Sequence, residues 1–124
     1  MFNLENVCIM TANIKQLAEF YSNLINVDCD WIGEDYVILR TETGTFSLYN
    51  IECYNKIANN SAIAKSNQNS ILEFRVENIE VEYEKVKKLG AKIIKELRVE
   101  EWGAKCFYFL DPDDNMINFF YYPI

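Results

Sequence analysis

Hydrophobic and polar positions along the chain follow two periods, and these periods occur in the same order twice. Residues 6–11 form a short, mostly apolar run, and residues 72–76 alternate apolar and polar side chains; both segments, 6–11 and 71–76, are predicted to be strands. Residues 14–25 and 79–89 carry apolar side chains at helical spacing, which predicts a helix after each of those strands. Each helix is followed by three further predicted strands, at 28–33, 36–41 and 45–50 and then at 92–99, 104–110 and 116–122. The pattern therefore predicts a β-α-β-β-β unit that occurs twice.

The two halves also align without a gap. Val7 aligns with Leu72, and Asn13 aligns with Asn78, each pair separated by the same number of positions. Both asparagines stand directly before a predicted helix, where a side-chain oxygen accepts a hydrogen bond from a free backbone N–H. One helix covers only one face of a four-stranded sheet, so each unit is expected to leave a face open. We therefore expect an α+β fold in which the helices lie outside and the open sheet faces line a concave surface.

The segment between the halves is polar and rich in Asn and Ser. Residues 51–69 are predicted to connect a first unit at about 4–50 with a second unit at about 70–122. Within the connection, residues 58–65 are predicted to form a short helix. Because half of the 124 residues are hydrophobic, the whole chain is expected to form a single domain.

The net charge and the positions of the cysteines indicate which binding partners, cellular location and metal site can be expected. The chain carries 19 acidic and 12 basic residues, a net charge of -7, so nucleic acid and anionic membranes are not expected partners. The sequence contains neither a secretion signal nor an apolar run of the roughly 20 residues that cross a bilayer, so a cytosolic location is expected. The four cysteines are spaced singly and are expected to be reduced thiols; a zinc site would require the fold to gather them.

Alternation along the predicted strands selects side chains for the concave surface. Aromatic rings and a few polar groups fall in the register that points away from the helices, which suits an amphipathic or aromatic small molecule. Core packing or a dimer interface is an equally good explanation of the rings, because strands favour aromatic residues. Glu73 and Arg75 could likewise form no more than a surface ion pair. The candidate ligand-binding residues are Asn6, Tyr36, Ser47, Tyr49, Glu73, Trp102, Asn118 and Phe120.

Three segments carry a resemblance to a known family, and together they extend over most of the chain. They are NVCIMTANIKQLAEFYSNLINV, FRVENIEVEYEKVKKLGAKI and WGAKCFYFLDPDDNMINFF, and the last contains a DPDDN turn at residues 111–115. This pattern resembles the vicinal oxygen chelate superfamily of glyoxalase I, extradiol dioxygenases and bleomycin or fosfomycin resistance proteins, in which the corresponding turn is DPDGN. The resemblance implies two βαβββ units that form a curved mixed sheet. It also implies a homodimer.

The resemblance also bears on metal binding. Enzymes of this superfamily hold a divalent metal with His or Gln, Glu, His and Glu side chains, and the matching positions here are Asn6, Ser47, Ile71 and Asn118. The chain contains no histidine, so a glyoxalase site with His ligands or a 2-His-1-carboxylate iron site cannot be built from it. Oxygen ligands such as Glu73 with Asn6 and Asn118 would hold Mg²⁺ or Mn²⁺ only weakly. We therefore expect neither a metal nor another cofactor.

Three functions remain open. The preferred hypothesis is a non-catalytic small-molecule binding protein that sequesters a drug or an aromatic ligand, as metal-free members of the resembling superfamily do. The second is a metal-independent lyase or isomerase in which Glu73 is the general base and a tyrosine is the acid. The third is a dimeric interaction module with a vestigial cavity, for which the aromatic segment at residues 117–124 would form the interface.

Overall fold

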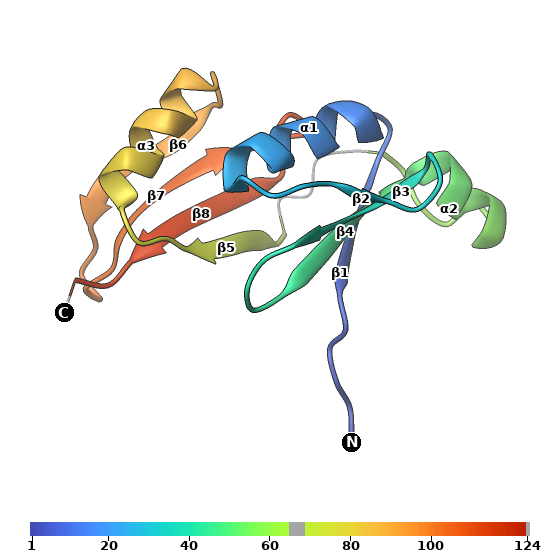
Figure 1. Ribbon diagram of the computed structural model, residues 1–124, viewed down its shortest axis with the longest axis horizontal. Coiled ribbons are helices and arrows are strands. Elements are labelled where there is room, and N and C mark those ends of the chain that lie inside the picture. Colours follow the sequence, from blue (N-terminus) through green and yellow to red (C-terminus); the bar gives the residue numbers. More distant parts are fainter. Residues whose placement is uncertain (65–68, 124) are drawn as a thin grey trace. The chain divides into compact units, whose positions relative to one another are not determined.

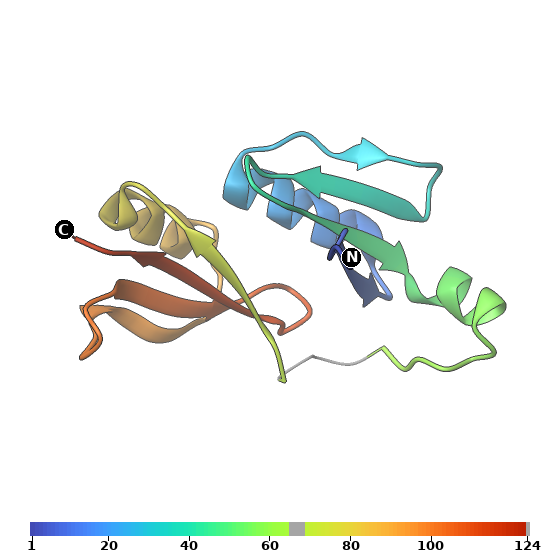
Figure 2. The ribbon, with the colours of Figure 1, turned by 90° about the horizontal axis from the view of Figure 1, so that it is seen from below.

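The computed structural model describes residues 1–64 and 69–123, and the chain divides into two compact units, Met1–Lys65 and Ser66–Ile124. Each unit contains a four-stranded mixed sheet with a helix along one face (Figures 1 and 2). The α+β fold of two βαβββ units is confirmed. The expectation of a single domain stays a prediction.

The first unit contains β1 (Val7–Thr11), α1 (Ile14–Ile25), β2 (Asp30–Trp31), β3 (Tyr36–Arg40), β4 (Thr45–Asn50) and α2 (Ile51–Ile57). Its strands lie in the order β1-β4-β3-β2, with β1 parallel to β4 and the other pairs antiparallel. The helix α1 packs against β3 and β4. Its buried residues Leu17, Tyr21 and Leu24 lie on the same side of the sheet as the buried Val37 and Leu48. The opposite face of this sheet is the open face of the first unit.

The second unit contains β5 (Ile71–Arg75), α3 (Ile79–Lys88), β6 (Ile93–Val99), β7 (Lys105–Leu110) and β8 (Met116–Tyr121). Its strand order, β5-β8-β7-β6, repeats that of the first unit. The pairing register repeats as well, because Cys8 pairs with Ser47 in the first sheet and Glu73 pairs with Asn118 in the second. Ser47 and Asn118 are therefore equivalent positions in the two units.

The helix ends follow the expected local chemistry. The Asn13 side-chain oxygen accepts a hydrogen bond from the backbone N–H of Gln16 at 3.4 Å, and the Asn78 oxygen accepts one from Val81 at 3.5 Å. Asn26 ends α1 in the left-handed conformation, with a φ of 54°. These contacts fix where each helix begins and where the first one ends.

The connection between the units differs from the prediction. Residues 58–64 form no helix, and residue 65 lies outside the described residues; the helix is instead α2, directly after β4. Asn50 starts it early, because its side-chain oxygen accepts a hydrogen bond from the Glu52 backbone at 3.0 Å. Asn59 and Asn60 end it, since both adopt positive φ values, 56° and 53°, that a right-handed helix cannot contain.

One predicted strand is also shorter than expected. Residues 28–33 were predicted as a strand, but β2 covers only Asp30–Trp31. The chain turns directly after it, since the Ile32 N–H donates to the Tyr36 carbonyl at 2.9 Å and Gly33 has a φ of 70°. The other predicted strands agree with the structure to within one residue at each end. No helix in the described part of the chain has the length and apolar character needed to span a membrane.

Candidate functional site

The open face of the first sheet carries a neutral hydrogen-bond network. The fully buried Ser47 Oγ accepts from the Asn6 amide nitrogen at 2.7 Å and from the Tyr36 hydroxyl at 2.9 Å. The Asn6 side-chain oxygen is used too, because it accepts from the Thr45 hydroxyl at 3.2 Å. The Tyr49 ring packs edge-on against the Tyr36 ring, with 5.4 Å between the centroids. Asn6, Tyr36 and Ser47 thus form one hydrogen-bonded group, and the Tyr49 ring packs against it.

The open face of the second sheet carries a row of side chains that crosses all four strands. Glu73 on β5 pairs with Asn118 on β8, Asn118 pairs with Tyr108 on β7, and Tyr108 pairs with Lys95 on β6. Directly paired residues share one face of a sheet, so these four side chains form a continuous row. The row begins with an exposed carboxylate, continues through a buried amide and a half-buried phenol, and ends with an ammonium group.

Hydrogen bonding within the row is incomplete. The Asn118 amide nitrogen donates to Glu73 Oε2 at 2.9 Å. The Asn118 Oδ1 atom is buried and has no hydrogen-bond partner among the described residues. Burial raises the pKa of the Tyr108 hydroxyl above its usual value, so this group stays a neutral donor and acceptor.

A second row lies beside the first. It contains Arg75, Phe120, Cys106 and Arg98, which are paired across the same four strands. The Arg75 guanidinium lies 5.4 Å from the centroid of the Phe120 ring and 5.8 Å from that of Tyr122. Burial raises the pKa of the Cys106 thiol, which keeps it protonated. This row therefore adds one aromatic surface and two cations to the open face.

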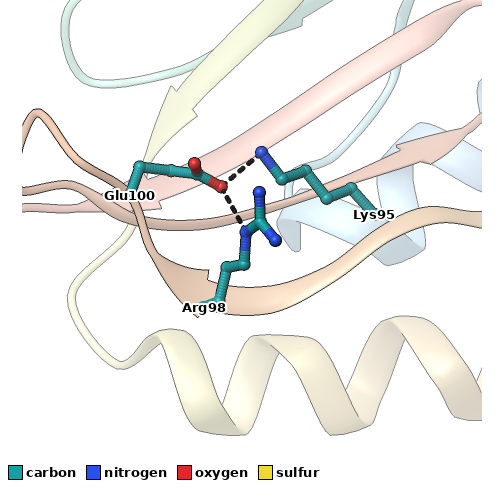
Figure 3. A network of polar contacts seen from close by, with 3 residues as sticks. All are labelled: Lys95, Arg98 and Glu100. Atoms are coloured by element: carbon teal, nitrogen blue, oxygen red, sulfur yellow. Dashed lines mark hydrogen bonds and ion pairs between the residues drawn. The ribbon is translucent and has the colours of Figure 1, made fainter.

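Irregularities in β6 bring Lys95 and Arg98 onto the same face. Residues three apart on a regular strand point to opposite faces, but the register of β6 shifts between Ile93 and Lys95 and again between Lys95 and Arg98. Both cations then reach the buried Glu100 carboxylate, with Arg98 Nε at 3.0 Å from Glu100 Oε1 (Figure 3). Lys95 contacts the same oxygen. The hydrogen bonds from Arg98 and then Lys95 lower the pKa of Glu100 below its ordinary value.

The turn that follows β6 presents Trp102. The Glu100 N–H donates to the Ala104 carbonyl at 2.8 Å, and Gly103 adopts a φ of 97°, which closes a tight connection to β7. The Trp102 side chain is 60% exposed at this turn. The Lys95 ammonium lies 6.0 Å from the Trp102 ring centroid and 5.6 Å from that of Tyr108. Lys95 therefore links the exposed indole to the row.

The predicted site residues thus fall into two groups, one in each unit. Asn6, Tyr36, Ser47 and Tyr49 lie together on the first sheet. Glu73 and Asn118 lie together on the second sheet, with Phe120 in the adjacent row and Trp102 at the turn. Sequence reasoning missed Tyr108 and Lys95. Tyr108 could have been found by counting back from the turn at residues 111–115, whereas the shifts in β6 that turn Lys95 to this face leave no signal in the sequence.

The donor set does not suit the divalent metal that the superfamily's enzymes use. Asn6 and Ser47 bond to each other, and Ile71 has no ligand atom in its side chain, so of the four matching positions Asn118 alone, within the described residues, has a buried side-chain oxygen without a hydrogen-bond partner. Neutral amide and hydroxyl oxygens are poor ligands for transition metals. Within residues 1–64 and 69–123, no group of three or more His, Cys, Asp or Glu side chains is placed to hold a metal ion.

Comparison with known proteins identifies the family. A model of the glyoxalase-like domain matches residues 4–120. The Bacillus subtilis (strain 168) protein YraH is 23% identical over 123 residues, which is 94% of this chain and 96% of that protein.

Solved structures show the same fold. A glyoxalase-related enzyme from Fulvimarina pelagi superimposes with a TM-score of 0.85 at 10% identity, over 100% of this chain and 91% of that one. A glyoxalase/bleomycin resistance protein/dioxygenase family enzyme from Burkholderia phytofirmans PsJN gives a TM-score of 0.84 at 19% identity, over 98% and 100% of the two chains. The chain therefore belongs to the glyoxalase-like domain family, within the vicinal oxygen chelate superfamily.

Proposed function

We propose that this protein binds a small organic molecule on the open face of its second sheet, without a metal ion and without transforming the ligand. The proposal rests on one observation, the row of side chains formed by Glu73, Asn118, Tyr108 and Lys95. It offers polar groups at both ends and a phenol ring between them, which is the mixture of apolar surface and few directed polar groups that small-molecule sites present. Sequestration of an aromatic compound or drug is the use that such a surface suits.

The aromatic side chains on this face support an aromatic or amphipathic ligand. Tyr108 is half-buried, and Phe120 lies in the adjacent row. The exposed Trp102 adds a large apolar surface at the edge of the same sheet. Rings of this kind give contact area at a low cost in side-chain entropy.

Catalytic functions have less support. A carboxylate acts as a general base near neutral pH when an apolar surrounding raises its pKa, but the Glu73 side chain is exposed. A metal-assisted reaction would need donors that the four matching positions do not supply.

A thermal-shift screen tests the proposal. The full chain is heated with a library of aromatic and amphipathic compounds, and at least one compound is expected to raise the Tm in a saturable manner. Binding is then measured for Tyr108→Ala and for the control Tyr83→Ala. Tyr83 is also half-buried in the second unit, but its ring packs against Phe107 on the helix side.

The two variants separate binding from stability. Both remove a ring and are expected to lower the Tm, but only Tyr108→Ala is expected to weaken ligand binding, by at least tenfold. If no compound in a broad library stabilises the protein, or if both variants bind the ligand as the original chain does, the proposed site is wrong.

A further inference from the structure

Two acceptors stand side by side at one end of the row. The Asn118 side chain is 5% exposed, and its oxygen has no donor among the described residues. The adjacent Glu73 accepts one hydrogen bond, from the Asn118 amide nitrogen, through Oε2. Because that nitrogen binds the carboxylate, the orientation of the amide is set, and Oδ1 is the atom left without a partner.

A buried acceptor without a donor is uncommon in folded proteins, because its desolvation is not compensated. The equivalent position of the first unit shows the ordinary solution: Ser47 Oγ is also buried, and it accepts from two side chains. The flanking residues of β8, Ile117 and Phe119, are buried on the helix side of the sheet, and neither carries a side-chain donor. The second unit thus retains an unsatisfied acceptor where the first unit has none.

The charges around the acceptors decide what kind of donor suits them. The Arg75 guanidinium lies over the rings of Phe120 and Tyr122, and the Lys95 and Arg98 cations share the Glu100 carboxylate. Among the described residues, Glu73 forms no ion pair. Three cations and two carboxylates face this surface, so its overall charge does not attract a cation. Selection must come from direct donation to the two acceptors.

We propose that the ligand places an N–H group, carried on an aromatic ring, against Asn118 Oδ1 and the Glu73 carboxylate. This inference rests on the proposed function, since it names the chemical class that the same surface binds. One N–H satisfies the buried amide oxygen, and a second gains the stronger hydrogen bond that a carboxylate accepts. The exposed Glu73 side chain can move without disturbing the core, which gives the ligand access to the amide. Amides, amidines and amines on aromatic rings meet this requirement, whereas carboxylates and esters do not.

Four small probes of similar size test the donor requirement. Benzamide and benzamidine carry N–H donors, whereas methyl benzoate and benzoate carry none, and binding of each to the full chain is measured by NMR titration. Benzamide and benzamidine are expected to bind at least tenfold more tightly than methyl benzoate, and benzoate is expected to bind most weakly. Methyl benzoate or benzoate binding as tightly as benzamide overturns the inference and leaves the proposed function standing.

Two variants assign the preference to its residues. Asn118→Leu is expected to lower benzamide affinity at least tenfold, to the level of methyl benzoate. Glu73 is exposed, so Glu73→Gln is expected to fold normally. This variant is expected to weaken the binding of benzamidine more than the binding of benzamide. Unchanged affinities in both variants overturn the inference.

If none of the four probes binds, the compounds found in the library screen test the inference instead. Ligands without an N–H group contradict the inference. Ligands with an N–H group support it if Glu73→Gln or Asn118→Leu weakens their binding. If no compound of any class binds, the proposed function and the inference both fail.

Discussion

Replacing Asn118 with leucine is expected to leave the fold as stable as before or to make it more stable. The two side chains have the same branching and the same number of non-hydrogen atoms, and the position is 5% exposed. Leucine removes an acceptor that has no partner among the described residues, a defect that costs about 1–3 kcal/mol. It also removes the hydrogen bond to Glu73, worth about 0.5–1.5 kcal/mol, but the exposed carboxylate then returns to water. The expected change in the free energy of unfolding lies between a loss of about 0.5 and a gain of about 2.5 kcal/mol, whereas most point substitutions cost about 1 kcal/mol.

The equivalent residue of the first unit provides the matched control. Ser47→Ala deletes an oxygen that accepts from both Asn6 and Tyr36, and each lost hydrogen bond costs about 0.5–1.5 kcal/mol. This variant is therefore expected to be less stable by about 1–3 kcal/mol. Urea denaturation followed by circular dichroism measures both changes. A loss of more than about 1 kcal/mol in Asn118→Leu would refute the argument, because it would mean that the Asn118 oxygen is satisfied in the folded protein.

Three further predictions concern pH, metals and assembly. The folded-state pKa of Glu100 is lowered, so its ion pairs stabilise the protein above the unfolded value of about 4.3 and are lost as the pH falls toward the folded value. In Glu100→Gln, the free energy of unfolding should therefore fall less steeply as the pH decreases below about 4.3. Urea denaturation at a series of pH values measures this dependence, and an unchanged pH dependence would count against the role of Glu100. Addition of Ni²⁺, Zn²⁺, Mn²⁺ or Mg²⁺ should leave the Tm unchanged, because the donors at the four matching positions are unsuitable; a saturable rise would contradict that conclusion. Analytical ultracentrifugation should show a homodimer, as the family resemblance implies, and a monomer at all concentrations would exclude it.

Much of the architecture could be predicted because the repeat leaves a periodic signal in the sequence. Short runs rich in apolar residues, bounded by turn residues, located seven of the eight strands to within one residue at each end, and Asn13 and Asn78 marked both main helix starts. The second strand was overestimated because hydrogen bonding at a turn, which the pattern does not encode, ends it after Trp31. The short helix was misplaced because helical spacing does not report the positive φ values of Asn59 and Asn60.

The candidate site could be predicted only in part. Asn118 and Glu73 were found together because each lies on a regular strand, where alternation assigns a face. Lys95 was missed because register shifts within β6 change the face of single residues. The missing partner of Asn118 Oδ1 was also beyond sequence reasoning, since it depends on which atoms of neighbouring side chains meet. Local periodicity therefore identified the surface, and tertiary contacts determined its chemistry.

NMR mapping of the binding site shows whether the ligand binds to the open face of the second sheet. The most stabilising compound from the screen is titrated into isotope-labelled protein. The largest saturable shifts are expected at the Asn118 side-chain amide and at the backbone amides of Glu73, Tyr108 and Lys95. Shifts confined to the first sheet around Ser47, or to the helix side around Tyr83, would contradict the account.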